Sequence, residues 1–185
     1  SLLGTRSLII SKVMPNDTVK DSTEAVKVTL EAETREGYKD GEAICEYSDT
    51  GRENSYIQFY NTNSYTHSQD LWLPEGSYIY YIKCIDLGGN SDIKTVEFDV
   101  ETDTETPIVT RAYHEGTLLR VTTNEEAKCV YSTKNCDYVL EDGTAMRSVE
   151  NIDHYVDWSR TTYYVKCEDS YGNVQGSCYR AIQVI

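Results

Sequence analysis

The sequence predicts an all-β chain made of two tandem antiparallel β-sandwiches, and three observations lead to this expectation. Apolar and polar residues alternate over short runs, which is the pattern of strands with one buried and one exposed face. Turn residues separate these runs, and no stretch shows the periodicity of an amphipathic helix. A set of matching segments recurs at a spacing of 83 to 84 residues, which indicates a duplicated domain.

The strands are clearest in the first copy. Val26, Val28 and Leu30 alternate with polar neighbours, so one face of this strand is expected to be buried. Many short strands at such spacing favour a sandwich. The strands expected in this copy lie at 8–14, 26–33, 42–48, 80–84 and 95–100, and turn signals lie at 15–17, 49–51 and 88–90.

The duplication is carried by two pairs of segments. Residues 42–48 match residues 126–132, and residues 76–90 match residues 161–173. In the second copy, turn signals lie at 141–143 and 171–173. The expected domains are residues 1–103, including an N-terminal extension, and residues 104–185.

Four of the six cysteines belong to the repeat. Their even number and the small size of the domains indicate an oxidising compartment. We pair Cys45 with Cys84 and Cys129 with Cys167. Zinc is the rival interpretation, but the close Cys-x-x-Cys pairs that it favours are absent from the sequence.

The other two cysteines, Cys136 and Cys178, have no counterpart in the first copy. We expect them to bridge each other as an extra clip within the second domain. In a sandwich of this kind they would lie toward opposite ends of the sheet, so a bond between neighbouring subunits is the alternative.

The cysteine segments form a motif, Cys-x-Tyr-Ser, then His, then Tyr-x-x-x-Cys-x-Asp followed by Gly-Asn. It occupies residues 45–48 with 80–90, and again residues 129–132 with 163–173. This motif resembles the immunoglobulin-like or fibronectin-type-III-like repeats of secreted and surface-anchored bacterial and archaeal proteins. The resemblance implies two tandem immunoglobulin-like sandwiches and a secreted, extracellular location at the cell surface. Such repeats serve as stalks, spacers, adhesin modules and filament subunits.

The charge of the chain limits its partners. The formal net charge is −14 and the isoelectric point is about 4.5, so the surface repels nucleic acid and anionic lipid. No apolar run approaches the ~20 residues that span a bilayer, so membrane insertion is not expected. Any signal peptide is expected to be already absent.

No catalytic residues are expected. The sequence has no Gly-x-Ser-x-Gly elbow, no phosphate-binding glycine loop and no His-Glu-x-x-His. His67 and His154 occupy comparable places in the two copies, which favours a structural role in each sandwich. We therefore expect a protein that is not an enzyme.

Calcium is the one cofactor that the sequence suggests. Asp99, Glu101, Asp103 and Glu105 alternate between the two domains, and hard oxygen ligands suit a structural Ca²⁺. A solvated acidic linker is the alternative interpretation of the same residues.

Three further features are candidate sites or turns. Asn16 begins an Asn-Asp-Thr glycosylation sequon on an expected turn. Trp72 has the opposite face parity to its leucine neighbours, so it is a candidate contact residue as well as a candidate for edge packing. The Asp and Asn residues after the second cysteine of each copy are interpreted as turn residues first, and as a cation site second.

These expectations favour a non-enzymatic function. We expect a structural or adhesive extracellular protein that associates with itself or with other surface proteins. A specific form is the subunit of a filament, assembled through the segment 1–7 and the strand edges. The alternative is a carbohydrate- or ligand-binding module of a larger secreted protein, to which the outward Tyr81 and Tyr164 would contribute.

Overall fold

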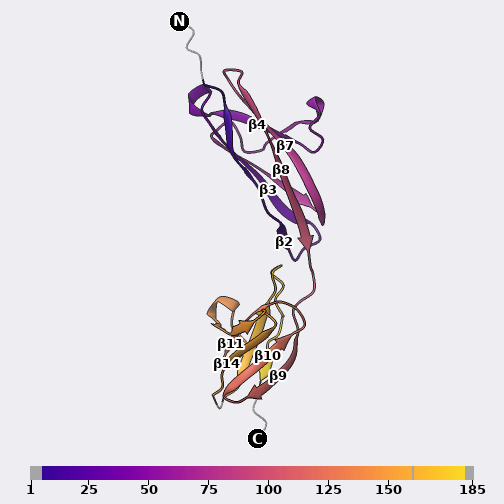
Figure 1. Cartoon of the computed structure of the whole chain (residues 1–185), viewed down its shortest axis with the longest axis vertical. Helices are drawn as coiled ribbons and strands as arrows, with labels where there is room; N and C mark the ends of the chain where they lie inside the picture. The colour runs from indigo at the N-terminus through magenta and orange to yellow at the C-terminus, as the bar shows by residue number, and fades with distance from the viewer. Residues whose placement is uncertain (1–5, 160, 182–185) are drawn as a thin grey trace. The chain divides into compact units, whose positions relative to one another are not determined.

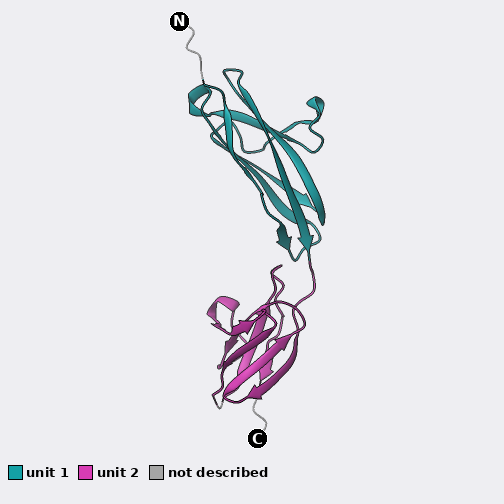
Figure 2. Cartoon of the chain, in the orientation of Figure 1, with its two compact units in different colours: residues 1–102 teal, residues 103–185 magenta. Residues whose placement is uncertain are grey.

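The computed structural model describes residues 6–159 and 161–181, and in this part of the chain all regular structure is strand or single-turn 3₁₀ helix. The all-β expectation is therefore confirmed. None of the described segments is a helix that could cross a membrane. The chain divides into two compact units, Ser1–Thr102 and Asp103–Ile185 (Figure 2). The expected boundary lies one residue after this division.

Unit 1 is a sandwich of two sheets (Figure 1). The first sheet has the order β1-β3-β6, with β1 at Ile9–Met14, β3 at Val26–Arg35 and β6 at Thr66–Leu73. The second has the order β2-β8-β7-β4-β5, with β2 at Val19–Asp21, β8 at Ser91–Thr102, β7 at Gly76–Asp86, β4 at Ala43–Ser48 and β5 at Ile57–Gln58. Two 3₁₀ turns, η1 (Tyr38–Asp40) and η2 (Glu53–Ser55), flank β4.

The core of unit 1 follows the alternation read from the sequence. On β3, residues 26, 28, 30 and 32 are buried while 27, 31 and 33 are exposed. Each fully buried side chain of this kind contributes about 1.5–3 kcal/mol relative to exposure. The inward faces of both sheets complete one cluster of buried residues: Leu8, Ile10, Val26, Val28, Leu30, Ala32, Ala43, Cys45, Phe59, Tyr80, Ile82, Cys84, Val96, Phe98 and Val100.

Near its start, the chain changes from one sheet of unit 1 to the other. β1 pairs with β3 in the first sheet, and after the turn at 15–18 β2 pairs with β8 in the second. The β2–β8 pair is parallel, from Val19 opposite Val100 to Asp21 opposite Thr102. The beginning of unit 1 is thus hydrogen-bonded to its last strand.

Unit 2 repeats this plan with shorter strands. One sheet has the order β13-β14-β10-β9, with β13 at Arg147–Val149, β14 at Asp153–Asp157, β10 at Leu118–Thr123 and β9 at Val109–Glu115. The other has the order β12-β11-β15-β16, with β12 at Thr144–Ala145, β11 at Lys128–Ser132, β15 at Tyr163–Glu168 and β16 at Tyr179–Ala181. A 3₁₀ turn, η3 (Leu140–Asp142), precedes β12. Its buried cluster comprises Val109, Leu119, Val121, Ala127, Cys129, Tyr163, Val165, Cys167 and Ala181.

The two repeat-related disulfides form as expected, each within one sheet. Cys45 lies directly opposite Cys84 on β4 and β7, and Cys129 lies opposite Cys167 on β11 and β15. The Cα–Cα distances are 4.0 and 4.1 Å. Opposed antiparallel residues that do not exchange hydrogen bonds lie about this close, so adjacent strands accept the bond without rearrangement.

The third disulfide joins Cys136 to Cys178 within unit 2, as the preferred expectation had it. The loop after β11 turns back over the sheet, where the Tyr138 hydroxyl donates to the carbonyl oxygens of Val130 and Tyr164. β16 begins only at Tyr179, directly after Cys178. This folded-back loop brings together two cysteines that a straight topology diagram places apart.

Candidate binding site

The candidate site is a hollow of about 380 Å³ on unit 1, beside β6 and the segment after β5. β6 ends its sheet, so this side of the strand is an edge. The hollow is lined by Gln58, Tyr60, Asn61, Ser68, Gln69, Asp70 and Trp72. Its volume falls within the range of pockets that hold small ligands.

Two aromatic rings stand in solvent at this hollow. Trp72 is 64% exposed and Tyr60 is 88% exposed. On β6, the buried His67 and the core-packed Leu71 point inward, so Trp72 points outward with Ser68 and Asp70. Trp72 therefore lies on the open face, which is the less favoured of the two settings that its parity left open.

Backbone and amide contacts hold the segment after β5 against β6. The backbones of Asn61 and Ser68 exchange two hydrogen bonds of 3.1 and 2.9 Å. The Gln69 side chain accepts from the N–H of Tyr60 at 2.8 Å and donates to the carbonyl oxygen of Asp70 at 2.8 Å. Asn61 Nδ2 donates to Ser68 Oγ at 3.0 Å. Hydrogen bonds among the lining residues thus hold the segment after β5 to β6.

Asp70 is the charged group of the hollow. Lys27 Nζ lies 2.8 Å from one carboxylate oxygen, and the Thr29 hydroxyl donates to the other at 2.7 Å. These two hydrogen bonds, Lys27 first, hold the pKa of Asp70 below its usual value. The carboxylate is therefore charged at neutral pH, and Lys27 balances its charge.

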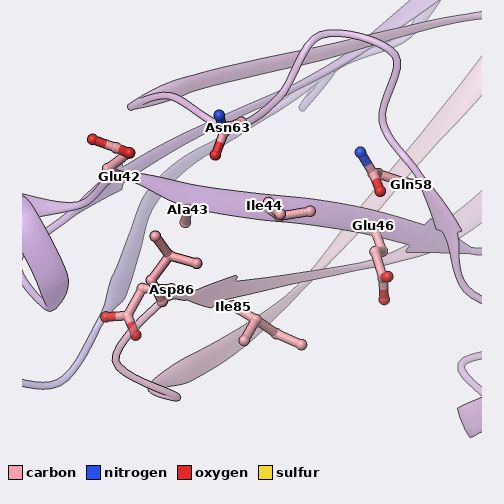
Figure 3. Close-up of a pocket in the computed structure, with 9 residues that line it drawn as sticks. Glu42, Ala43, Ile44, Glu46, Gln58, Asn63, Ile85 and Asp86 are labelled. Carbon is pink, nitrogen blue, oxygen red and sulfur yellow. The ribbon is translucent and has the colours of Figure 1, made fainter.

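A second hollow, of about 310 Å³, lies over β4 and the end of β7 (Figure 3). Glu42, Glu46 and Asp86 supply its carboxylates, with Ile44 and Ile85 between them. Lys39 pairs with Glu42 at 3.2 Å, and Asp86 is engaged by the neighbouring turn. Much of its charged rim therefore serves local structure.

His67 takes part in a buried hydrogen-bond chain. The Cys45 N–H donates to Thr62 Oγ1 at 2.8 Å, and Thr62 Oγ1 lies 2.8 Å from His67 Nδ1. On the other side, His67 Nε2 lies 2.9 Å from Thr34 Oγ1, which donates to the Gly41 carbonyl oxygen. Because Thr34 donates its only proton to Gly41, its oxygen can only accept from His67, and Nε2 is therefore a protonated nitrogen.

The His67 ring nitrogen also lies within 4.8 Å of the sulfur atoms of Cys45 and Cys84. Those sulfurs are bonded to each other and are not metal ligands. Burial lowers the pKa of His67 to about 4, so the ring remains uncharged. The contacts are those of a structural histidine.

His154 holds the matching place in unit 2 with fewer partners. It is opposite Val121 as His67 is opposite Ala32, and its Nε2 lies 3.4 Å from Thr123 Oγ1. Its Nδ1 has no hydrogen-bond partner among the described residues. Burial lowers its pKa as well. Unit 2 thus keeps the contact between Thr123 and the histidine Nε2 but lacks a counterpart of the contact between Thr62 and His67 Nδ1.

The Asp–Asn turns after the second cysteines are alike in both units. Asp86 accepts from the Asn90 backbone and side chain at 2.9 and 2.8 Å, and Asp169 accepts from Asn173 at the same distances. Burial alone would raise the pKa of Asp86, but hydrogen bonds from Asn90, Tyr38 and Gly88 lower it below its usual value. The turn interpretation of these residues fits this geometry.

Three of the four carboxylates expected for calcium make contacts within their own unit. Asp99 accepts from the Ser77 hydroxyl, Glu101 pairs with Lys20 at 3.4 Å, and Asp103 accepts from the N–H of Glu105. These contacts occupy part of the acceptor capacity of Asp99, Glu101 and Asp103.

Asp103, the first residue of unit 2, lies near two other carboxylates of the same unit. Its oxygen lies within 4.8 Å of oxygens of Glu125 and Asp169, and Asp169 is buried. Sequence reasoning missed both partners because they come from different loops. Carboxylate oxygens are the ligands that Ca²⁺ prefers, and calcium binding stays a prediction.

The remaining candidates from the sequence are Asn16, Tyr81 and Tyr164, and they differ in exposure to solvent. Asn16 is exposed in the turn between β1 and β2, where a glycan would be accessible. Tyr81 and Tyr164 are half-buried. A Cβ at Gly51 would meet the Tyr81 ring at 3.0 Å, so this ring packs under a loop and is not a free platform.

Comparisons with known proteins show what the fold resembles. No protein-family model matches the chain, and no curated protein matches it in sequence. The fold is similar to fibronectin(III)-like modules of CbhA from Clostridium thermocellum, with a TM-score of 0.53 and 12% identity, over 94% of this chain and 92% of that one.

Two further structures give the same result. The FN1–FN3 domains of chicken CNTN1 match with a TM-score of 0.55 and 11% identity, over 94% of this chain and 67% of that one. A set of titin domains matches with a TM-score of 0.50 and 13% identity, over 90% of this chain and 60% of that one. At such low identity these similarities show the fold alone. The chain is therefore built of tandem immunoglobulin-like, fibronectin-III-like sandwiches, as the sequence predicted.

Proposed function

We propose that the chain is a non-enzymatic structural or adhesive module that works outside the cell. The observation that carries this proposal is the set of three disulfides, which uses all six cysteines. Disulfides persist in oxidising compartments and are rare where glutathione keeps thiols reduced. The buried histidines support the non-enzymatic part, because each contacts a threonine inside its own sandwich and burial lowers the pKa of both.

In a finer form of the proposal, the module associates with copies of itself or with other surface proteins, and one such assembly is a filament. The edge of β6 supports this form. Ser68 directs its backbone groups away from β3, toward Asn61, so the alternation of the strand directs those of Asp70 and Trp72 the same way. The Asp70 carbonyl oxygen already accepts from the Gln69 side chain, which leaves the Asp70 N–H and the backbone groups of Trp72 for a partner. No described strand pairs with β6 there, and such an edge can accept another strand.

The segment 1–7 was the other expected assembly element. Residues 1–5 lie outside the described residues, so this part of the proposal rests on the sequence alone. The Cys136–Cys178 bond forms within one chain, which supports assembly without disulfides between subunits. The alternative function, a ligand-binding module of a larger secreted protein, is supported by the hollow beside Trp72.

The extracellular proposal is tested by the redox state of the protein in its native source. Alkylation of free thiols before lysis, followed by non-reducing peptide mass mapping, should return three linked peptide pairs and no alkylated cysteine. Recovery of Cys45 and Cys84 as free, alkylated thiols would contradict it.

The filament form is tested by negative-stain electron microscopy and light scattering of the full chain. Regular fibres that disappear when residues 1–5 are deleted would support it. The Cys136→Ser/Cys178→Ser pair is the matched control and should leave the fibres intact. A monodisperse monomer under all these conditions would exclude the filament and leave the module.

A further inference from the structure

Unit 2 shows which residues of the hollow the fold itself needs, because the strands beside the hollow in unit 1 have matching strands in unit 2. The Phe59 N–H donates to the Cys45 carbonyl oxygen, and the Met146 N–H donates to that of Cys129, both at 2.9 Å. Phe59 therefore corresponds to Met146, and the same register holds for the neighbouring strand pairs, where Glu46 opposite Gln58 matches Val130 opposite Ala145.

This register makes Tyr60 an additional residue in unit 1. Asn61 bridges to Ser68, and the matching bridge in unit 2 joins Arg147 to Tyr155. Arg147 follows Met146 directly, whereas Tyr60 stands between Phe59 and Asn61. The additional residue is a bulky aromatic that is 88% exposed, so it fills no part of the core.

Other lining residues also lack counterparts. Counting along β6 and β14 from the matched histidines, Trp72 corresponds to Ser159 and Gln69 to Val156. Gln58 corresponds to Ala145. Unit 2 builds the same sandwich without the two rings and without these amides. The fold alone therefore does not require them, and two largely exposed aromatic rings beside a hollow favour a binding surface.

The groups around the hollow have the chemistry that binds a sugar. An aromatic face can cover the C–H face of a pyranose ring, and the amide and carboxylate groups between the rings can bond its hydroxyls. The Gln58 side chain has no hydrogen bond within the described part of the chain, so its donor and acceptor are both available. Asp70 has used two of its four acceptor positions.

The site is also preorganised. Gln69 ties the Tyr60 backbone to β6, and Asn61 is held by Ser68, so the backbone segment that carries Tyr60 is fixed beside the strand that carries Trp72. A ligand that binds here does not have to order a loop, which reduces the entropic cost of binding.

The charges select among sugars. Lys27 balances Asp70 at 2.8 Å, and the chain carries a net charge of −14, which repels uronates and sulfated glycans. We propose that the hollow formed by Tyr60, Trp72 and the polar side chains between them binds a neutral saccharide. This inference rests on the proposed function of an extracellular adhesive module and names its ligand class.

The test uses the full oxidised chain and exploits its two tryptophans. In a ¹⁵N-labelled sample each indole N–H gives one NMR peak, and Trp72→Phe identifies which peak is Trp72. Neutral oligosaccharides of glucan, mannan and galactan are titrated to millimolar concentrations, with oligogalacturonate as the anionic probe. At least one neutral sugar should shift the Trp72 peak and leave Trp158 unmoved, while oligogalacturonate should shift neither.

Variants then separate the site from the surface in general. Trp72→Ala and Tyr60→Ala should each weaken retention on the matching immobilised polysaccharide by about tenfold or more. Tyr65→Ala removes another exposed tyrosine of unit 1 that does not line the hollow, and it should bind as the parent does. All three should keep the parent melting temperature, because the side chains are exposed.

Three results would overturn the proposal. The Trp72 peak could remain unmoved by every neutral sugar, or Tyr65→Ala could lose as much binding as Trp72→Ala. Trp72→Ala could also abolish self-association in light scattering while sugars bind nowhere, which would assign the rings to a protein interface. None of these three results would change the outcome of the disulfide mapping, which tests the extracellular function. Free thiols in the native protein would contradict the extracellular function without contradicting sugar binding.

Discussion

The two ring nitrogens of His67 contact the hydroxyl groups of Thr34 and Thr62, each of which carries one proton. Thr62 links this ring to the backbone of Cys45, beside the disulfide of unit 1. The matching residue in unit 2, Ser148, is exposed and bonds Asn151 instead. The two units thus provide a variant and its control at corresponding positions.

Thr62→Ala should destabilise unit 1 by about 1–3 kcal/mol, because it leaves the Cys45 N–H and His67 Nδ1 without partners in a buried place. Ser148→Ala should change stability by less than about 0.5 kcal/mol. Chemical denaturation of the two variants measures the difference. Equal losses would mean that the chain of hydrogen bonds contributes nothing of its own.

The same histidine makes stability depend on pH. The ring titrates near pH 6.5 when unfolded and at about 4 when folded, so between these values only the unfolded chain binds the proton. Stability should be fully present above pH 6.5 and should fall as the pH drops toward 4, by an amount on the order of 2 kcal/mol.

His154 shifts in the same direction and adds to this fall. Asp70 and Asp86, whose pKa values lie below 3.8, lose their charge only at lower pH. Denaturant midpoints measured across the interval test the effect, and a flat profile between pH 6.5 and 4 would contradict it.

At this scale the sequence predicted more about packing than about binding. The parity of Trp72 and the structural role of the histidines followed from local patterns and from the repeat. The lining residues Tyr60 and Gln69 could not be foreseen, because neither has an identical residue at the matching place of the second copy. Only the strand register reveals that Tyr60 is an additional residue.

Among the elements, η1 is one that unit 1 has and that has no counterpart between β10 and β11 of unit 2. It lies between β3 and β4, where it brings the Tyr38 N–H to the Asp86 carboxylate at 2.7 Å. It ends at Gly41, which has φ +117°. A Cβ at Gly41 would lie 2.6 Å from the Arg35 Cα and 2.7 Å from the Thr34 carbonyl oxygen.

Gly41→Ala should therefore destabilise unit 1 by about 2 kcal/mol or more, since the added methyl group meets backbone and the φ angle is strained. Gly176→Ala is the control, because nothing lies within 4 Å of its Cβ. Thermal melts of both variants give the comparison. A Gly41→Ala protein that melts with the parent would show that β3 and η1 can shift to accept the side chain.

The strands with strict alternation, above all β3 and β8, were predictable because each buries one face against a single core. The 3₁₀ turns and the folded-back loop at 133–143 were not. They depend on single contacts at a distance, such as the Tyr138 hydroxyl on Val130, and on glycines whose φ is set by neighbours. The pairing of Cys136 with Cys178 was left open for the same reason.

For the molecule as a whole, the two cores differ in size. Among the described residues, fifteen form the buried cluster of unit 1 and nine form that of unit 2, so the described core of unit 2 is the smaller one. Each repeat-related disulfide closes a loop of 38 or 39 residues, worth roughly 4 kcal/mol by chain entropy. Unit 2 therefore depends more on its cross-links.

Calorimetry should show two transitions, and the lower one should belong to unit 2. Trp158 packs on the core of unit 2 while Trp72 is exposed, so the change in tryptophan fluorescence should follow the lower transition. Reductant should lower both transitions. A fluorescence change that coincides with the upper transition would contradict the assignment.

The parallel pairing of β2 with β8 determines how the chain responds to tension. If its two ends are pulled apart, β2 and β8 are drawn lengthwise past each other, so the bonds from Val19–Val100 to Asp21–Thr102 share the load at once. Within the described residues of unit 2, β16 is joined to β15 alone, so unit 2 should yield at lower force.

The disulfides then limit how far a yielding unit extends. Cys45–Cys84 shields 39 positions of unit 1 from the pull, and Cys136–Cys178 shields 42 positions of unit 2. In single-molecule stretching, reduction should add roughly 130 Å to the extension of unit 1 and roughly 140 Å to that of unit 2. In its oxidised form the chain would behave as a tether that yields under load and lengthens only in part.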